Sequence, residues 1–598
     1  MLQRVLYLLK TYLLTMLFFI IAKVAFMLYN SSQAFSAGDI LAVLWHGLSL
    51  DFSTALYIIS VPFLVCTASI WLGGIKALRI LLRAYYLLIA VAMTLAFVAD
   101  TSLYEFWLFK LDSSCLQYLE TPNEAMASVS LGYIVIRIIA IAVVSALIWW
   151  AYTHPRFSIT RGTHRIIESL VALLCIPLMI IGIRGGLRES TTNIGQVYFS
   201  QNQFLNHSAV NPVFNFIDSF DKADAEYSFM SNEACNKMMS ELYNTQSINC
   251  DTLLNTQHPN IIIILLEGCG GEFTEIGGRT DITPNLNKLA KEGIYFTNCY
   301  GNTWRTDRGT VCALSGYPSF PTLSVMKIPA KSRSLPNIAR TLQEERGYHT
   351  SYIYGGDINF TNTKGYLIGT GFNETISDKD FSLADQQSSS WGVCDEKVFD
   401  RAIQVIGDDH KKGTQSMNVI MTLSSHEPWD VPMQRKFDDE ELNAFYYLDK
   451  CIGEFVDKLK AHQLWDNTLL IILPDHGSRY QSYGYESRIT CHIPLIWTGG
   501  AVKIQKDIDV LCNQSDLAAT LLGQMGIPHE EFLFSRDVLS SSYRHPFATY
   551  SYTNHIALID STNQYHLYDL QDSRIEEDAH FRLSKALLQR ACEDLRDR

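Results

Sequence analysis

The chain has 598 residues, 48% of them hydrophobic, and a formal net charge of −13 at pH 7. A net negative charge without a basic tract argues against nucleic acid as the main partner. The length allows several domains, and the apolar residues are concentrated before about residue 190.

Five apolar runs occupy the N-terminal part. They lie near 5–29, 52–73, 79–99, 132–152 and 166–185. Each is close to the roughly 20 residues that a helix needs to cross a bilayer, so we predict a transmembrane domain of about five helices over residues 1–185. The first run lacks a small-residue cleavage site, which favours a permanent anchor over a signal peptide. The less apolar stretch Gly38–Phe52 is interpreted as an interfacial or re-entrant lead into the second span, with a sixth crossing as the alternative.

The charged residues of the loops predict the orientation of these helices, because Lys and Arg are retained on the cytoplasmic side. Basic residues precede the first run and follow the second and fourth runs: Arg4, Lys76, Arg79, Arg156, Arg161 and Arg165. The alternate loops, 30–51 and 100–131, contain a single basic residue, Lys110, among several acidic ones. We therefore expect a multi-pass protein of the cell (inner) membrane, with everything after residue 185 extracytoplasmic or periplasmic.

Ten of the thirteen cysteines lie beyond residue 230. With this orientation they face a compartment where disulfides can persist. Their spacing shows no CxxC pattern of a metal site, and the odd total prevents complete pairing within one chain. Cys235 and Cys250 are the local candidates for a bridge.

The remainder of the chain changes character twice. Residues 186–257 are polar and aromatic without clear periodicity, and we interpret them as a membrane-surface connector. From residue 258, apolar runs typical of strands covered on both faces appear at 260–266, 348–354, 417–423, 468–473 and 493–498. Helices are predicted between them, near 283–293, 335–347, 441–462 and 514–526. This alternation predicts an α/β domain with a mostly parallel sheet over residues 258–598.

Acidic and histidine side chains follow three of these strands. Glu267 comes directly after 260–266, His426 follows 417–423, and Asp475 with His476 follows 468–473. The carboxyl ends of parallel strands share one edge of a sheet, where the sites of such domains lie. Each residue alone has an ordinary interpretation, as a helix cap, a loop histidine or a polar turn. Together they predict a divalent cation bound by oxygen and imidazole.

The segment Gly301–Pro318 is the candidate source of a nucleophile. Before a helix-like stretch it offers three threonines and two arginines: Thr303, Thr306, Thr310, Arg305 and Arg308. A hydroxyl at a helix N-terminus gains free N–H groups and the helix dipole for an anion, and metal coordination would lower its pKa. The spacing alone does not choose among the three threonines, each of which could instead be a helix cap.

Four motifs in order make a more specific pattern. They are LLEG at 265–268, TDRG with LSGYP at 306–318, SSHEPW at 424–429 and PDHG at 474–477. Preceded by five spans, this pattern resembles the lipoteichoic acid synthase and phosphoglycerol transferase family, in the sulfatase-like branch of the alkaline phosphatase superfamily. The resemblance covers essentially the whole chain and implies a sulfatase-like catalytic domain at 258–598. It favours Thr306, because Ser315 and Gly316 stand where sulfatases place a Thr-Gly pair after their nucleophile.

The same resemblance implies the chemistry of the site. One divalent metal ion would be held by Glu267, Thr306, Asp475 and His476, with Mn²⁺ expected first and Zn²⁺ or Mg²⁺ as alternatives. Thr306 would be the catalytic nucleophile, and the substrate would be bound by His426, Arg305 and Arg308. Thr361 and Thr363 stand near the positions where Gram-positive synthases place a Trp and an Arg around glycerol phosphate. This departure leaves the transferred headgroup open, with Asp357 and Asn359 as alternative contacts.

The resulting hypothesis is a membrane-anchored, metal-dependent phosphoglycerol transferase. It would move phosphoglycerol, or a related phospholipid headgroup, from a lipid donor such as phosphatidylglycerol to an extracytoplasmic glycan or polymer through a phospho-threonine-type intermediate. The enzymatic alternatives are an extracytoplasmic phosphodiesterase or sulfatase-type hydrolase and a phosphoethanolamine transferase. A formylglycine sulfatase is disfavoured, because residue 306 is neither Cys nor Ser. A catalytically dead scaffold is the third class, disfavoured by the intact set of metal-site residues.

Overall fold

The computed structural model describes residues 1–31, 35–113, 115–116, 130–154, 160–222, 227–243, 252–570 and 578–598. The chain divides into two compact units, Met1–Ala223 and Asp224–Arg598. The expected connector at 186–257 is divided between these units. Cys250 is outside the described residues, and so is the candidate bridge to Cys235.

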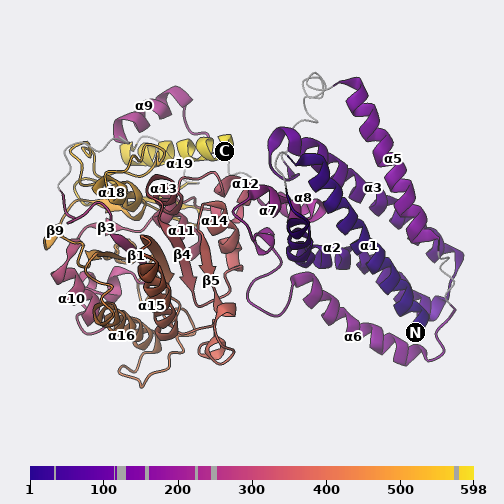
Figure 1. Cartoon of the computed structure of the whole chain (residues 1–598), viewed down its shortest axis with the longest axis horizontal. Coiled ribbons are helices and arrows are strands. Elements are labelled where there is room, and N and C mark those ends of the chain that lie inside the picture. Colours follow the sequence, from indigo (N-terminus) through magenta and orange to yellow (C-terminus); the bar gives the residue numbers. More distant parts are fainter. Residues whose placement is uncertain are drawn as a thin grey trace. The chain divides into compact units, whose positions relative to one another are not determined.

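Five long apolar helices form most of the first unit (Figure 1). They are α1 (Leu2–Asn30), α2 (Ala37–Leu72), α3 (Lys76–Trp107), α5 (Leu131–Thr153) and α6 (Arg165–Arg184). These are the helices of the described residues that are long and apolar enough to cross a membrane. The prediction of about five spans is confirmed.

Helix α2 is longer than the sequence predicts. The Ser36 side chain accepts a hydrogen bond from the N–H of Asp39, and the Asp39 carboxylate accepts one from the N–H of Ser36. From this cap the helix runs unbroken for 36 residues, about 54 Å at 1.5 Å per residue. The stretch Gly38–Phe52, expected as a lead into the second span, is helical and its backbone continues directly into that span.

Buried charges join the helices of the first unit. Lys23 of α1 donates to Asp51 of α2 over 2.8 Å, and Asn211 donates to the other oxygen of Asp51 over 2.9 Å. Asn211 caps α8 (Pro212–Asp218), which follows α7 (Gln203–Ala209). Because a buried charge is costly unless it is paired, these contacts fix the first part of the expected connector onto this unit.

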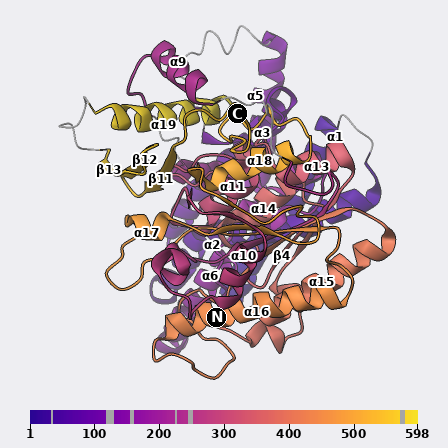
Figure 2. The same ribbon diagram turned by 90° about the vertical axis from the view of Figure 1, so that its left-hand side faces the viewer.

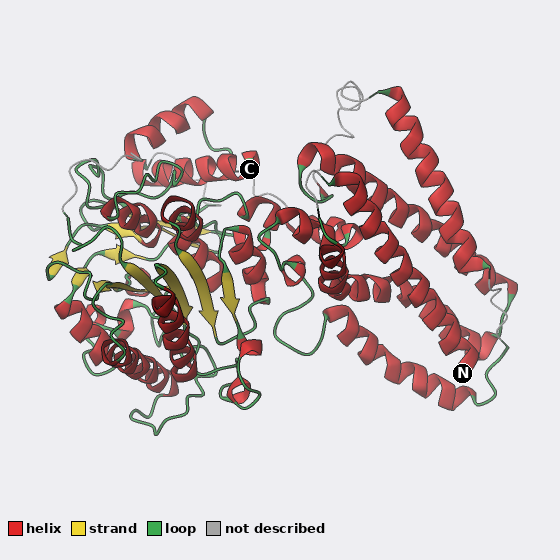
Figure 3. Cartoon of the chain, viewed as in Figure 1, coloured by secondary structure: helices red, strands yellow, loops and turns green. Residues whose placement is uncertain are grey.

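An eight-stranded sheet forms the centre of the second unit (Figure 3). Its order is β5-β4-β6-β1-β7-β8-β2-β9. The strands are β1 (Asn260–Leu266), β2 (Ile294–Phe296), β4 (His349–Tyr354), β5 (Glu374–Ile376), β6 (Ser416–Met421), β7 (Thr468–Pro474), β8 (Leu495–Thr498) and β9 (Lys506–Ile508). All of them pair in parallel except β8, which runs antiparallel to both its neighbours. The expectation of a mostly parallel sheet is confirmed.

Helices cover both faces of this sheet (Figure 2). One layer contains α11 (Thr306–Ser315), α13 (Ile338–Arg346), α14 (Thr363–Gly369) and α18 (Leu517–Gln524); the other contains α10 (Pro284–Glu292), α15 (Asp395–Lys412) and α16 (Glu440–Ala461). Ile261 and Ile263 of β1 pack into the first layer, whereas Ile262 and Ile264 pack into the second. Because β1 is buried on both faces of the sheet, its sequence is a continuous apolar run.

Two smaller sheets and a C-terminal helix complete the second unit. The parallel pair β3 (Cys299–Tyr300) and β10 (Cys512–Asn513) is one sheet, and β11 (Ala548–Tyr552), β12 (His555–Ile559) and β13 (Tyr565–Asp569) form an antiparallel one. The thiol of Cys235, on α9 (Asn232–Leu242), lies 3.2 Å from the carbonyl oxygen of Ala586 on α19 (Ala579–Asp597). The later part of the expected connector therefore packs on the C-terminal end of the chain.

Candidate active site

Three neighbouring strands carry the residues that the sequence predicts for a metal site. Strand β1 lies between β6 and β7 and runs parallel to both. At their carboxyl ends, the N–H of Glu267 donates to Oγ1 of Thr422 (3.0 Å), and the N–H of Asp475 donates to the carbonyl oxygen of Leu266 (3.1 Å). The strand order thus brings together side chains that are far apart in the sequence.

Helix α11 brings Thr306 to the same edge. The helix begins at Thr306, where free N–H groups and the helix dipole favour an anion. Its close approach to β7 requires glycine at position 309, because a Cβ atom there would lie 1.9 Å from the carbonyl oxygen of Asp475. Gly309 therefore sets how near Thr306 comes to Asp475.

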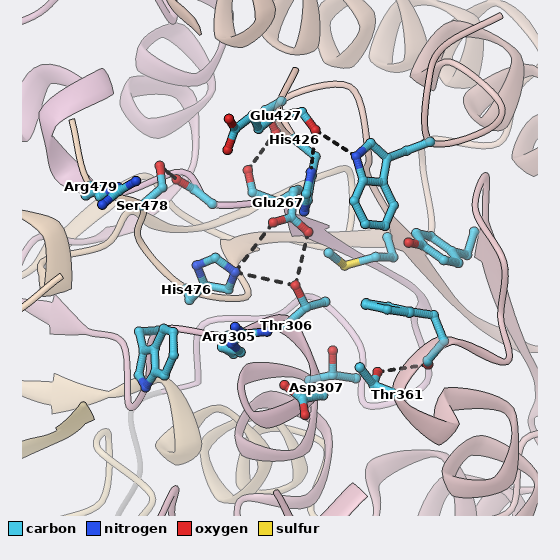
Figure 4. Close-up of a pocket in the computed structure, with 18 of the residues that line it drawn as sticks. Glu267, Arg305, Thr306, Asp307, Thr361, His426, Glu427, His476, Ser478 and Arg479 are labelled. Carbon is cyan, nitrogen blue, oxygen red and sulfur yellow. Dashed lines mark hydrogen bonds and ion pairs between the residues drawn. The ribbon is translucent and has the colours of Figure 1, made fainter. Parts of the chain in front are cut away.

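The hydroxyl of Thr306 lies between Glu267 and His476 (Figure 4). Its Oγ1 atom is 3.1 Å from Oε2 of Glu267 and 3.4 Å from Nε2 of His476. The same Nε2 atom is 3.4 Å from Oε1 of Glu267 and 3.5 Å from Oδ2 of Asp475. The structure therefore places all four predicted ligands in one cluster, and Glu267, Asp475 and His476 are buried there.

Hydrogen bonds with the backbone orient Asp475 and His476. Oδ1 of Asp475 accepts from the N–H groups of Gly268 (3.0 Å) and His476 (2.7 Å). Among the described residues, its buried Oδ2 has no hydrogen-bond partner. Nδ1 of His476 donates to the carbonyl oxygen of Gly477 (2.9 Å), so Nε2 is the nitrogen that faces the cluster. Each side chain thus uses one atom for the fold and presents another to Thr306.

The charges of the cluster shift its pKa values strongly. Burial and the negative charge of Glu267 raise the pKa of Asp475 to about 7. Burial alone would lower the pKa of His476, but the carboxylates of Asp475 and Glu267 raise it to about 9. Burial also works against ionisation of Glu267, but hydrogen bonding and charge from His476 outweigh it and lower the pKa of Glu267. The two buried carboxylates, Glu267 and Asp475, therefore repel each other, and a nearby positive charge would stabilise their ionised forms.

The donor atoms of this cluster fit a divalent cation. Two carboxylates, one imidazole and one hydroxyl are ligands that Zn²⁺ and Mn²⁺ accept. The spacings of 3.1 to 3.5 Å between donor atoms are those of ligands bonded to one ion at about 2.1 Å, which lie roughly 3.0–3.5 Å apart. A cation would also satisfy Oδ2 of Asp475. Glu267, Asp475 and His476 are therefore a candidate metal site, with Thr306 beside them.

Three residues of the cluster, Glu267, Thr306 and His476, line a pocket of about 670 Å³. This volume is within the roughly 300–1,000 Å³ of small-molecule sites. Two exposed arginines, Arg305 and Arg479, contribute positive charge, and several aromatic side chains form the walls: Trp304, Tyr354, Phe360, Trp391, Trp429 and Tyr485. Positive and aromatic surfaces together suit a phosphate ester that carries an organic group.

The loop that carries His426 is held next to Glu267 by hydrogen bonds. Oγ of Ser425 donates to the carbonyl oxygen of Glu267 (2.6 Å). The N–H groups of Leu423 and Ser424 donate to the carboxylate of Asp395, at the start of α15 (2.8 and 3.1 Å). These bonds position the loop without using the side chain of His426.

The imidazole of His426 faces the pocket. Its ring packs on Trp391, with the ring centroids 4.2 Å apart. Nδ1 donates to the carbonyl oxygen of Glu427 (2.8 Å). Nε2 is therefore the ring nitrogen that a ligand in the pocket can reach.

The structure separates the candidates that the sequence left together. Thr303 and Thr310 are almost fully buried, and of the three threonines, all described, Thr306 is the one whose hydroxyl lies within hydrogen-bond distance of Glu267 and His476. Arg308 does not line the pocket. Its guanidinium donates to the carbonyl oxygens of Phe320 and Pro321 (2.7 and 2.9 Å), so we leave Arg308 out of the proposed site.

Other pocket residues come from loops, from a short 3-10 helix at Phe360–Asn362 and from the start of α14. Thr361 and Thr363 line the pocket, whereas Asn359 is buried and donates to Asp357 (3.0 Å). Arg479 and Trp391 were not predicted. Arg479 lies three residues after His476, so its closeness to the PDHG motif could have predicted its place in the pocket. Trp391 lies in the loop between β5 and α15, and no local pattern marks its approach to His426.

The residues that form the cluster lie in a segment of the chain that matches a known protein family. Residues 259–527 match the family described as Sulfatase. We call these residues the sulfatase domain, after the family that they match. This sulfatase domain contains Glu267, Thr306, Asp475 and His476, and it begins one residue before β1.

Curated relatives of the chain include a transferase and a synthase by name. The chain is 25% identical over 242 residues to phosphoglycerol transferase I of Xanthomonas campestris, an alignment that covers 36% of this chain and 33% of the relative. It is 23% identical over 344 residues to lipoteichoic acid synthase 2 of Bacillus subtilis, covering 51% of this chain and 52% of the relative. These names confirm the family resemblance of the motifs. The chain spans about half, or less, of the length of these relatives.

A solved structure shares the fold of the sulfatase domain. A protein of the alkaline phosphatase superfamily from Vibrio parahaemolyticus is 24% identical and superposes with a TM-score of 0.53, covering 62% of this chain and 98% of that one. This likeness concerns the fold. The predicted combination of a helical membrane domain and a sulfatase-like α/β domain is therefore confirmed.

Proposed function

We propose that this protein is a membrane-anchored, metal-dependent phosphoglycerol transferase. It transfers phosphoglycerol from phosphatidylglycerol to a hydroxyl group of an extracytoplasmic glycan or polymer. The observation that carries the proposal is the hydroxyl of Thr306, which begins α11 at the pocket and lies 3.1 Å from Glu267 and 3.4 Å from His476. The names of the relatives, phosphoglycerol transferase and lipoteichoic acid synthase, support this choice of reaction.

Thr306 acts as the nucleophile in the first step. Its hydroxyl donates a hydrogen bond to Oε2 of Glu267, which gives the departing proton a path. Oγ1 then forms a bond to the phosphorus of the donor, and the bond from phosphorus to the diacylglycerol oxygen breaks. Diacylglycerol leaves with a proton donated by Nε2 of His426, and phosphoglycerol remains on Thr306.

An acceptor hydroxyl reverses this chemistry in the second step. It gives its proton to Nε2 of His426 and attacks the same phosphorus, while the bond to Thr306 breaks and Thr306 regains its proton. Arg305 and Arg479, both exposed at the pocket, hold the phosphoryl oxygens through charge-assisted hydrogen bonds. Fixed positive groups of this kind supply most of the rate in phosphoryl transfer.

The cation proposed for this site is one divalent ion, with Mn²⁺ as the first choice and Zn²⁺ or Mg²⁺ as alternatives. Glu267, Asp475 and His476 would hold it beside Thr306. When bound, it would lower the pKa of the Thr306 hydroxyl and neutralise phosphoryl charge. The five apolar helices keep the domain at a membrane, where its lipid donor is found. We place the sulfatase domain on the extracytoplasmic side from the loop charges.

Intact-mass analysis of the full-length protein in vesicles tests this proposal. The vesicles contain headgroup-labelled phosphatidylglycerol and Mn²⁺, without an acceptor. We expect one phosphoglycerol group on Thr306 of the unmodified protein and none on Thr306→Ala. Addition of an acceptor glycan should move the label to the glycan, and Thr306→Ala should reduce this transfer by about 10³-fold or more.

Each other outcome points to a different function. Label recovered solely as free glycerol phosphate would make the protein a hydrolase, and transfer from phosphatidylethanolamine alone would make it a phosphoethanolamine transferase. Full activity of Thr306→Ala would eliminate the covalent step. Absence of divalent cation binding by the unmodified protein would leave the scaffold hypothesis. An unchanged thermal unfolding temperature of Thr306→Ala serves as the folding control.

A further inference from the structure

A second group of metal-ligating side chains lies in the antiparallel C-terminal sheet. Asp560 follows β12, His566 is on β13, and His580 is in the first turn of α19. One ligand atom from each lies within 4.8 Å of the other two. The three residues are not among those that line the pocket of Thr306, so they form a separate group.

The ligand atoms of this group have the spacing of a zinc site. Oδ2 of Asp560 lies 3.0 Å from Nε2 of His566 and 3.5 Å from Nε2 of His580. Two ligands of a tetrahedral ion at about 2.0–2.1 Å are roughly 3.3 Å apart. The imidazole rings are stacked, with centroids 4.3 Å apart and an interplanar angle of 15°, so both present Nε2 on the same side. Two imidazoles and one carboxylate are ligands that Zn²⁺ prefers.

Other contacts aim these atoms at one point. Oδ1 of Asp560 accepts hydrogen bonds from the N–H groups of Thr562 (2.8 Å) and Gln564 (3.0 Å). The turn therefore fixes this carboxylate with Oδ2 toward the two histidines. Oδ1 of Asp578 caps α19 by accepting hydrogen bonds from the N–H groups of His580 (2.8 Å) and Phe581 (3.1 Å), which fixes the start of the helix that carries His580.

We propose that Asp560, His566 and His580 bind a zinc ion that fastens helix α19 to the hairpin of β12 and β13. Asp560 and His566 come from the hairpin and His580 comes from α19, so the ion links these two elements. The side chains of His566 and His580 are 23% and 38% exposed. This exposure gives an ion access from solvent and leaves room for water as the fourth ligand.

The proposed ion would also stiffen one wall of the active-site pocket. Tyr565 precedes His566, and its hydroxyl donates to the carbonyl oxygen of Glu486 (2.6 Å). Glu486 adjoins Tyr485, which lines the pocket. A fixed β13 therefore holds the segment that carries Tyr485, and loss of the ion should increase amide hydrogen exchange there.

Zinc stoichiometry in the full-length protein tests this site apart from the first one. A chain with Asp475→Asn and His476→Gln loses two ligands of the catalytic cluster, so the remaining zinc reports on the second group. After removal of metals, incubation with Zn²⁺ alone and desalting, we expect about one zinc per chain in this background. Adding His566→Gln and His580→Gln should reduce it to about zero and abolish the rise in unfolding temperature caused by zinc.

Matched controls separate this site from non-specific binding. His410 and His462 are exposed histidines in other elements, and their replacement by Gln should leave the zinc content unchanged. His580→Gln alone tests the site if the double replacement fails to fold, because His580 is the most exposed ligand. Zinc that persists in His580→Gln, or a background chain that retains none, would overturn the proposal. Activity is not the readout, so its outcome is independent of the proposed transferase reaction.

Discussion

Asp475 divides its two carboxylate oxygens between the backbone and the catalytic cluster. Oδ1 accepts hydrogen bonds from the N–H groups of Gly268 and His476, and Oδ2 faces the cluster. An asparagine can keep the first role through its carbonyl oxygen, but it brings no negative charge to the second. We therefore expect Asp475→Asn to fold and to bind Mn²⁺ at least about 100-fold more weakly at the cluster.

Calorimetric titration of the metal-free full-length protein with Mn²⁺ measures this loss. Glu292→Gln is the control, because Glu292 is exposed on α10 and pairs with Lys288 at 3.9 Å. Unchanged Mn²⁺ affinity in Asp475→Asn would show that Asp475 is not a ligand. An unfolding temperature far below that of the unmodified protein would instead assign Asp475 a structural role.

Glu272 gives the sulfatase domain a pH-dependent stability. The side chain is buried, and burial together with the charge of Glu441 raises its pKa to about 8. Between pH 4.5, the ordinary pKa of a glutamate, and about pH 8, Glu272 is therefore protonated in the folded state and ionised in the unfolded state. In that window the free energy of unfolding falls as pH rises, by up to about 1.4 kcal/mol per pH unit.

Replacement of Glu272 by Gln removes this titration. Between pH 6 and pH 8, the unfolding temperature of the unmodified protein should fall by several degrees relative to that of Glu272→Gln, which corresponds to about 2 kcal/mol. Parallel curves for the two proteins over this range would contradict the assignment. The measurement compares how the unfolding temperatures of the two proteins change with pH. A constant loss of stability from burying the amide of Glu272→Gln therefore does not affect the comparison.

At the scale of an element, the position of α11 depends on one missing side chain. A methyl group on Gly309 would meet the carbonyl oxygen of Asp475 at 1.9 Å, and neither backbone can move without shifting the helix or β7. We expect Gly309→Ala to lower stability by about 1–3 kcal/mol. Because Thr306 lies on the same helix, a displacement near 1 Å should reduce transfer by about 100-fold.

Gly407 is the matched control for this substitution. It lies in α15, and an added Cβ meets nothing within 4 Å. Gly407→Ala should leave transfer unchanged and stabilise the helix by about 0.5–1 kcal/mol. Thermal unfolding and the transfer assay are applied to both variants. Equal behaviour of the two would show that the approach of α11 to β7 does not determine activity.

Elements with a strong local pattern could be predicted, and contacts between distant loops could not. The strand at 260–266 follows from its apolar run, and Thr306, Glu267, Asp475 and His476 follow from motifs in order. Trp391 packs on His426, but it lies in a loop whose sequence shows no hydrophobic periodicity that would predict this contact. Arg308 has the same local surroundings as Arg305, but its carbonyl partners lie beyond α11. The antiparallel direction of β8 depends on tertiary pairing, which an apolar run does not encode.

At the scale of the whole chain, the boundary between the two units was the part that the sequence predicted least well. A connector was expected over 186–257 because these residues lack a period of their own. The structure divides them, since Asn211 pairs with a buried charge of the first unit and Cys235 packs on α19 of the second. Both partners are remote in sequence, so local composition could not reveal them.

The orientation of the five helices decides which side of the membrane the sulfatase domain faces. Lys76 and Arg79 lie where α2 gives way to α3, and basic loops are retained in the cytoplasm. We expect an alkaline phosphatase reporter, active after export, to be active when fused to Arg598 of the full chain. It should be inactive when fused after Arg79, a position that retains both basic residues. A fluorescent protein that matures in the cytoplasm should give the opposite pattern at the same two positions. The reverse result for both reporters would place the sulfatase domain in the cytoplasm, away from an extracytoplasmic glycan, and would contradict the proposed acceptor even if Thr306 is modified by lipid.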